Sequence, residues 1–138
     1  MVELLDCTIR DGGYINNWRF NNEFILEYIK LSNSVKYIEI GFINKNKNYK
    51  DSIVGPYRCL TKDIINNINP KYSETVVLAD YNDINYELLE EKITIDIVRI
   101  AFHKNDMENG LEACIKVKNM GYKVSVNAMA INNYDENS

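Results

Sequence analysis

Five short runs rich in valine and isoleucine recur along the 138-residue sequence, with segments of helical spacing between them. Apolar runs of this length are typical of strands that are covered on both faces. A regular alternation of strands and helices predicts a parallel sheet with right-handed crossovers. The expected strands are residues 2–7, 35–42, 75–80, 95–102 and 122–130.

The segments between the strands carry signals for the ends of helices. Asn21 or Asn22 can cap the first helix, Pro70 ends the second, and Gly121 occupies the left-handed position after the last. The asparagine- and lysine-rich run at 44–50 is interpreted as a solvated loop. The expected helices are residues 21–31, 60–68, 85–92 and 107–118.

The order of these elements indicates an α/β fold made of parallel β/α repeats. A closed (β/α)8 TIM barrel needs about 250 residues. We therefore expect the N-terminal part of such a barrel, with about five strands, as one partial-barrel domain over residues 1–138 that is truncated at its C-terminus. Unpaired edges and an uncovered inner face favour a homo-oligomer or pairing with the missing half. The alternative is a self-contained open sheet with helices on both faces.

Composition excludes several classes of protein. A net charge of −4 without a basic patch argues against nucleic acid, so a small-molecule substrate is expected. The three cysteines are far apart and form no C-x-x-C pair, which favours a reducing cytoplasm over a disulfide framework or zinc knuckle. No signal peptide is recognised, and no apolar run approaches the roughly 18 residues of a membrane span.

The first expected strand leads directly into Arg10 and Asp11, which are followed by Gly12 and Gly13. Sites in parallel α/β proteins form at the C-terminal ends of strands. A carboxylate oxygen suits Mg²⁺ or Mn²⁺, and a guanidinium can donate to an enolate or carbonyl oxygen. The glycines would allow a tight turn or close approach to a ligand. An internal ion pair with a glycine turn is the structural alternative.

The run Leu5-Asp6-Cys7-Thr8-Ile9-Arg10-Asp11-Gly12 resembles the D-x-T-[LI]-R-D-G signature of the DRE-type metal-dependent aldolases and lyases. These (β/α)8 barrels include hydroxymethylglutaryl-CoA lyase and 4-hydroxy-2-oxovalerate aldolase. The resemblance implies that Arg10 is the catalytic electrophile and that Asp11 binds a divalent metal, Mg²⁺ or Mn²⁺. The family takes its other metal ligands from an H-x-H motif, which this sequence lacks. We therefore expect an incompletely ligated metal and an inactive fragment.

Two further positions extend the comparison with this family. Tyr14 stands where relatives often have glutamine or histidine, and we expect it to pack or contact substrate rather than transfer a proton. The run from Gly12 to Trp18 resembles an uncharacterised aldolase-like branch. Glu39 lies in a strand with apolar neighbours, where a charge is costly unless it is paired. It could pair with Arg10 and hold the guanidinium, or form a buried ion pair without a direct role.

Polar residues at the ends of the later strands could line the same pocket. Asp80 ends the third expected strand, although it could only cap the next turn. His103 follows the fourth strand, where it could touch substrate, and Asn127 lies on the fifth. Arg99 is expected to face inward, where a phosphate or carboxylate would suit it. Asp80, His103 and Asn127, with Tyr14 and Glu39, are therefore candidate substrate-binding residues.

Together these features predict a metal-dependent aldolase or lyase that cleaves or forms a carbon–carbon bond beside the carbonyl of a 2-oxo acid or acyl-CoA-like substrate. Arg10 would stabilise the enolate oxygen, and the proton would move through His103, Tyr14 or the missing half. One alternative is a non-catalytic α/β domain for ligand binding or assembly. Another is a flavodoxin-like domain that binds phosphate and gives Arg10 no role. The sequence has no G-x-G-x-x-G, Walker, G-x-S-x-G or H-E-x-x-H motif.

Overall fold

One parallel sheet organises the protein. The computed structural model describes residues 2–32, 34–45, 53–68 and 70–134. In this part of the chain each strand pairs with its neighbours in sequence, in the order β1-β2-β3-β4-β5. The strands are β1 (Leu5–Asp6), β2 (Tyr37–Phe42), β3 (Glu74–Asp80), β4 (Ile97–Phe102) and β5 (Lys123–Ala128).

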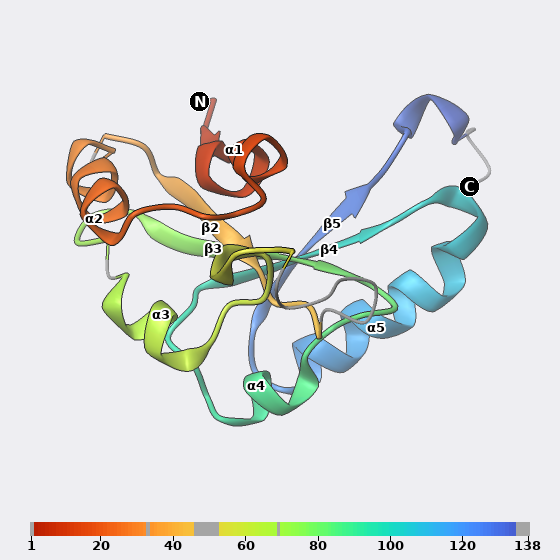
Figure 1. The fold of residues 1–138 in the computed structure, drawn as a ribbon. Helices are drawn as coiled ribbons and strands as arrows, with labels where there is room; N and C mark the ends of the chain where they lie inside the picture. Colours follow the sequence, from red (N-terminus) through yellow and green to blue (C-terminus); the bar gives the residue numbers. More distant parts are fainter. Residues whose placement is uncertain (1, 33, 46–52, 69, 135–138) are drawn as a thin grey trace.

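The sheet curls into half of a barrel (Figure 1). Its strand order never reverses, whereas an open doubly wound sheet has a switch point at which the order changes direction. The expected N-terminal part of a TIM barrel is therefore confirmed, and the alternative of an open sheet covered on both faces is wrong.

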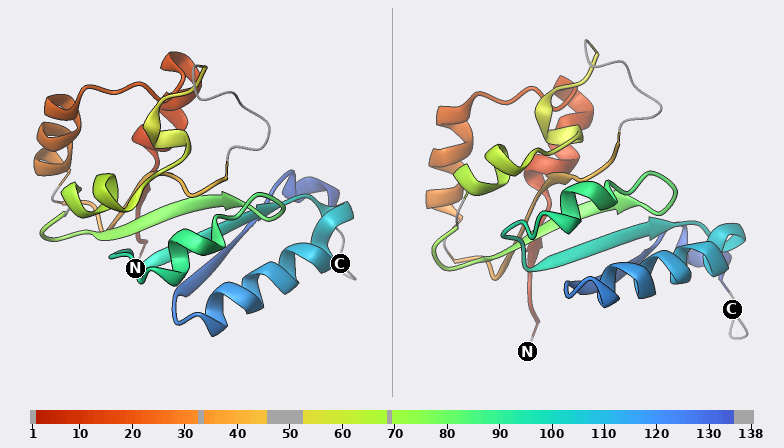
Figure 2. Two further views of the ribbon diagram at one scale, coloured as in Figure 1. Left: turned by 60° about the horizontal axis from the view of Figure 1, so that its bottom comes forward. Right: turned by 90° about the horizontal axis from the view of Figure 1, so that it is seen from below.

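Five α-helices and two short 3₁₀ turns connect the strands in the described part of the chain, and a third turn follows β5. Figures 1 and 2 show α2 to α5 following one another around the outside of the curled sheet, while α1 packs against β2 and η1. The helices are α1 (Thr8–Asn16), α2 (Asn22–Leu31), α3 (Lys62–Asn67), α4 (Tyr86–Glu90) and α5 (Met107–Asn119). The turns are η1 (Pro56–Arg58), η2 (Lys104–Asp106) and η3 (Ile131–Asn133).

Most of the predicted elements are confirmed, with ends shifted by a few residues. Asn21 is the N-cap of α2, and its side chain accepts a hydrogen bond from the Glu23 N–H at 2.8 Å. Gly121 follows α5 with a φ of +99°. The first strand is shorter than expected because the Thr8 N–H already donates to the Asp6 side chain at 2.8 Å and begins α1. Residues 46–50 of the predicted loop lie outside the described residues.

The predicted turn at Gly12 and Gly13 is wrong, because both glycines lie inside α1. Gly13 is needed there for a close contact instead: a Cβ atom on it would lie 2.0 Å from the ring of Trp18. After α1 the backbone of Asn17 and Trp18 is left-handed, and the Trp18 N–H donates to the Gly13 carbonyl at 2.9 Å. The chain therefore folds the buried indole back onto the helix that carries Arg10.

The two faces of the sheet differ in chemistry. On the outer face, under the helices, alternate residues of β2, β3 and β4 are apolar and fully buried: Ile38, Ile40, Val77, Ala79, Val98 and Ile100. The intervening positions on β2 and β4 include the charged residues Glu39 and Arg99. Within the described part, no helix combines the length and apolar character needed to cross a membrane.

We predict that Gly13→Ala lowers the free energy of unfolding by at least about 2 kcal/mol, because the new methyl group overlaps the Trp18 ring. Gly12→Ala is the matched control, since its Cβ would meet only Phe20 at 3.6 Å. Alanine also favours a helix by about 1 kcal/mol over glycine, so this variant should be neutral or slightly more stable. Urea unfolding measures both, and equal effects would contradict the proposed contact.

Candidate functional site

A buried carboxylate joins two arginines on the inner face of the sheet. Glu39 of β2 has a fully buried side chain. Its Oε1 accepts a hydrogen bond from Arg10 Nε at 2.6 Å, and its Oε2 accepts one from Arg99 Nη1 at 2.8 Å. The predicted pairing of Glu39 with Arg10 is confirmed. Arg99 faces inward, as expected, and the carboxylate that it meets belongs to Glu39.

This group of residues links α1 to three strands. Arg99 on β4 also donates from Nη2 to Asn127 Oδ1 on β5 at 2.8 Å. The side chains of Arg10 and Arg99 are only 14% and 16% exposed, so both guanidiniums are largely withdrawn from water. Charge-assisted hydrogen bonds in such a setting are short and directional. The geometry therefore holds the Arg10 guanidinium in one orientation at the mouth of the half-barrel.

Arg10 remains charged in spite of its burial. Desolvation alone would lower the pKa of the guanidinium, but the hydrogen bond and charge of Glu39 outweigh it, and the pKa is raised. The nearby Cys7 thiol, in contrast, is held in its neutral form. Burial, followed by the negative charge of Glu39, raises the pKa of Cys7 and keeps the thiol protonated. Cys7 is thus a poor nucleophile at neutral pH.

Asp11 lies beside Arg10 and is ion-paired with it, but its side chain is 60% exposed. A hard carboxylate oxygen at an open rim fits as one ligand of Mg²⁺ or Mn²⁺. In the part of the chain that the structure describes, no three His, Cys, Asp or Glu side chains come together in a metal-binding cluster. The described residues therefore offer Asp11 as a single ligand and do not complete a site.

Among the described residues, no hydrogen bond links the Tyr14 hydroxyl to this group. It lies on α1 with an exposed side chain, and its ring meets Trp18 edge to face at a centroid distance of 4.7 Å. Trp18 in turn donates from Nε1 to the Arg10 carbonyl at 2.9 Å. The Tyr14 ring therefore packs against Trp18, one of the two roles expected from the sequence. Contact between Tyr14 and substrate stays a prediction.

Another ion pair forms at the C-terminal end of β3. Asp80 Oδ2 accepts hydrogen bonds from Arg58 Nη2 at 3.0 Å and from Asn44 Nδ2 at 2.6 Å. Asn44 also accepts from the Asp80 N–H at 3.1 Å. Asp80 is thus tied to two neighbouring segments rather than acting only as the cap of the following turn.

The sequence did not reveal Arg58 and Asn44 as members of this cluster. Both lie in the long connection between β2 and β3, outside the regular strand pattern. Both residues are buried in the structure, with Asn44 2% exposed and Arg58 7% exposed, and the sequence does not show this burial. The Arg58 guanidinium carbon also lies 3.8 Å from the centre of the Phe42 ring, a cation–π contact. A polar residue in a loop gives no such indication in the sequence.

His103 follows β4 and is exposed at the mouth of a cavity of about 220 Å³. Asp80 and Met129 line the same cavity, which places the ends of β3, β4 and β5 together. The structure therefore brings His103 near Asp80, while Arg10, Glu39, Arg99 and Asn127 form the adjoining set. Apart from Tyr14, the predicted site residues thus fall into two clusters.

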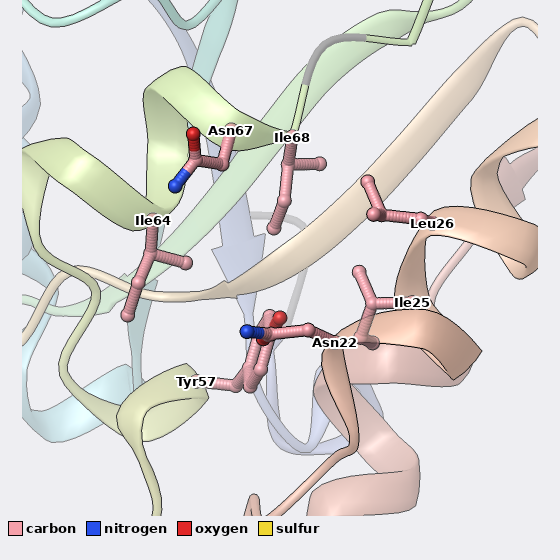
Figure 3. A pocket seen from close by; sticks show the side chains of 7 residues that line it. All are labelled: Asn22, Ile25, Leu26, Tyr57, Ile64, Asn67 and Ile68. Atoms are coloured by element: carbon pink, nitrogen blue, oxygen red, sulfur yellow. The ribbon is translucent and has the colours of Figure 1, made fainter.

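Another cavity, of about 250 Å³, lies between α2, η1 and α3 on the outer side of the sheet (Figure 3). Among the described residues, no carboxylate, histidine or cation lines it. Its walls are Asn22, Ile25, Leu26, Tyr57, Ile64, Asn67 and Ile68. This composition suits helix packing, and the ion-paired chemistry lies on the inner rim instead.

Comparison with known proteins finds a match among solved structures. No model of a known protein family matches the sequence, and no curated protein matches it. Among solved structures, the chain is similar to the "N-terminal domain of a putative aldolase from Bacteroides vulgatus", with a TM-score of 0.80 and 25% identity. The match covers 98% of this chain and 48% of that one.

The chain therefore spans about half of the length of the structure that it matches. The similarity supports an aldolase-like relationship and the half-barrel architecture. Membership of the metal-dependent family that residues 5–12 resemble stays a prediction, as do the metal and the roles of the site residues.

We predict that Glu39→Gln lowers the free energy of unfolding by about 3 kcal/mol, because two largely buried guanidiniums lose their shared counter-charge. Glu3→Gln is the matched control, since Glu3 forms an exposed ion pair with Lys36 and should contribute little. Urea unfolding of the two variants measures the difference. A Glu39→Gln protein as stable as Glu3→Gln would show that the buried carboxylate does not hold the site together.

We also predict that Cys7 is alkylated slowly at neutral pH, because its pKa is raised by burial and by Glu39. The rate of reaction with iodoacetamide should rise with a midpoint above the ordinary thiol value of about 8.5. In Glu39→Gln the midpoint should fall, since one of the two causes is removed. Mass spectrometry of the Cys7 peptide across a pH series gives the rate, and a midpoint below the ordinary value would refute the prediction.

Proposed function

We propose that this chain forms half of the barrel of an aldolase or lyase that cleaves or forms a carbon–carbon bond beside a carbonyl. The observation that carries the proposal is the Arg10–Glu39–Arg99 arrangement. It fixes a charged guanidinium at the C-terminal rim of a parallel half-barrel. The aldolase-like relationship of the matched structure supports the same reaction class.

In the cleavage direction, a base removes the proton from the substrate's hydroxyl group and the adjacent carbon–carbon bond breaks. The bonding electrons pass into the carbonyl and form an enolate. Arg10 donates hydrogen bonds to the enolate oxygen as its negative charge develops. Because Glu39 already holds Arg10, little reorganisation is needed when the charge appears. His103 is the candidate for proton transfer among the described residues.

Asp11 is the residue through which the protein would hold a divalent metal. Its carboxylate is exposed at the rim and adjacent to Arg10. When bound there, Mg²⁺ or Mn²⁺ would polarise the carbonyl of a 2-oxo acid or acyl substrate. The proposal places the other ligands in polypeptide that closes the barrel.

That closing polypeptide covers the inner face and the edge of the sheet. On the inner face, a cavity of about 350 Å³ beside Arg99 is lined by apolar residues together with Tyr37 and Ser125. Val126 on the edge strand β5 is half exposed. Sheet edges of this kind pair readily with further strands. We propose that the rest of the barrel comes from a longer gene product or from an associated copy.

The test is the exchange of methyl protons for deuterium in pyruvate or acetyl-CoA, followed by NMR in D₂O with Mn²⁺. This reaction reports enolate formation and needs no knowledge of the second substrate. The complete gene product should catalyse exchange in at least one of the two compounds. Arg10→Lys should slow it by about 10²–10³-fold, because a bidentate donor becomes a point charge.

Arg19→Lys is the matched control, because Arg19 is exposed and lies outside both clusters. It should leave the exchange rate unchanged. Absence of exchange in both compounds, or equal rates for Arg10→Lys and Arg19→Lys, would rule out the proposed role of Arg10. Absence of exchange in both compounds would also make the non-catalytic domain the better description.

A further inference from the structure

The cavity between α2, η1 and α3 contains one residue that helix packing does not explain. Its volume of about 250 Å³ exceeds the roughly 150 Å³ of an apolar cavity that binds benzene. Ile25 and Ile68 form buried apolar walls. The exposed residues Asn22 and Asn67 contribute amides from different sides of the cavity (Figure 3). The residue that packing leaves unexplained is Tyr57, which comes from η1.

Tyr57 is almost fully buried, and its hydroxyl has no partner among the described residues. The residue is 2% exposed. Burial raises the pKa of Tyr57, and neither a hydrogen bond nor a charge from a described residue contributes to this change. The phenol therefore stays protonated and can donate. A buried tyrosine hydroxyl normally finds a partner, because leaving it unpaired costs free energy.

The Tyr57 hydroxyl also keeps access to the cavity. It does not belong to the described side-chain atoms that are sealed from solvent without a partner. Because it has no partner in that part of the chain, it retains contact with open space, and the space that Tyr57 lines is this cavity (Figure 3). An edge-to-face contact with Phe20, at a centroid distance of 5.5 Å, fixes the ring. The hydroxyl is therefore presented to whatever occupies the cavity.

Water alone satisfies this cavity poorly. A volume of about 250 Å³ has room for about eight water molecules, at the roughly 30 Å³ that each occupies in the liquid. A buried water makes about three hydrogen bonds, and the tyrosine and two asparagines cannot supply them for that number. Displacing loosely held water with an apolar group gains affinity. An apolar body with one polar group for Tyr57 is therefore a better occupant than solvent.

The absence of charge decides which polar group the occupant carries. None of the described residues that line the cavity is ionised. An ionised ligand would lose its hydration there without gaining a counter-charge. Since the protonated phenol of Tyr57 donates, the ligand must offer an acceptor oxygen. The amides of Asn22 and Asn67 can donate or accept beside it.

We propose that this cavity binds a small uncharged compound with an apolar body and one hydroxyl or carbonyl oxygen, which accepts a hydrogen bond from Tyr57. The site lies on the outer side of the sheet, whereas the Arg10–Glu39–Arg99 arrangement lies on the inner face. It therefore goes beyond the proposed aldolase or lyase reaction and does not depend on it.

The experiment is a titration of the chain, with ¹³C-labelled isoleucine methyl groups, with phenol, toluene and benzoate. Phenol has the apolar body and the oxygen, toluene has the body alone, and benzoate is ionised. Phenol and toluene should give saturable millimolar shifts of the methyl signals of Ile25, Ile64 and Ile68. Benzoate should give no shift at these residues over the same range of concentration.

Tyr57→Phe is the decisive variant, because it removes the hydroxyl and keeps the ring. It should weaken phenol binding by about three- to tenfold, the effect of one hydrogen bond, and leave toluene binding within about twofold. Urea unfolding should show no loss of stability, since no hydrogen bond among the described residues is removed. Tyr72→Phe, at a position that is 66% exposed, is the matched control and should change none of these properties.

Any of four results would overturn this site. The first is the absence of saturable shifts at the three isoleucines with both phenol and toluene. The second is an unchanged phenol affinity in Tyr57→Phe, and the third is benzoate binding as tight as that of phenol. The fourth is a loss of stability in Tyr57→Phe, which would give the hydroxyl a structural role. Because the titration requires neither metal nor turnover, its failure is separate from a failure of the pyruvate and acetyl-CoA exchange assay.

Discussion

The burial of Glu39 is the constraint on which the inner face of this half-barrel depends. A carboxylate without solvent must find counter-charges nearby, and two guanidiniums supply them from α1 and β4. Its two oxygens are divided between the two arginines, so the loss of either arginine leaves one buried carboxylate oxygen without that partner. The same contacts that stabilise the sheet also fix Arg10 at the rim. Stability and the proposed chemistry thus share one set of hydrogen bonds.

Two glycines allow neighbouring segments to pack closely around this site. Gly41 on β2 has a φ of +148°, and a Cβ atom there would lie 2.4 Å from the Tyr57 carbonyl. The absence of a side chain lets η1 lie against the end of β2, and η1 carries Arg58 to Asp80. Gly13 does the same for Trp18, which supports the carbonyl of Arg10. Two glycines therefore set the positions of two arginines without touching either.

The sequence predicted well what depends on periodicity and poorly what depends on contacts between distant segments. The strands followed from short runs rich in valine and isoleucine, and the pairing of Glu39 with Arg10 followed from the cost of an unpaired charge. Helix α1 was missed because two adjacent glycines favour a turn, and only the packing of Trp18 explains them. Arg58 and Asn44 were missed because burial in a loop leaves no periodic pattern.

The agreement between strand order and chain order has a consequence for synthesis on the ribosome. Each strand pairs with the one made just before it, so no strand has to insert between two that are already joined. The sheet can grow at a single front as the chain emerges. To pair with the preceding strand, each new strand closes a loop of only one β/α unit. The loop-closure entropy that each pairing costs is therefore small. In the described half-barrel that front is β5, which pairs with β4 on one side and with no other described strand.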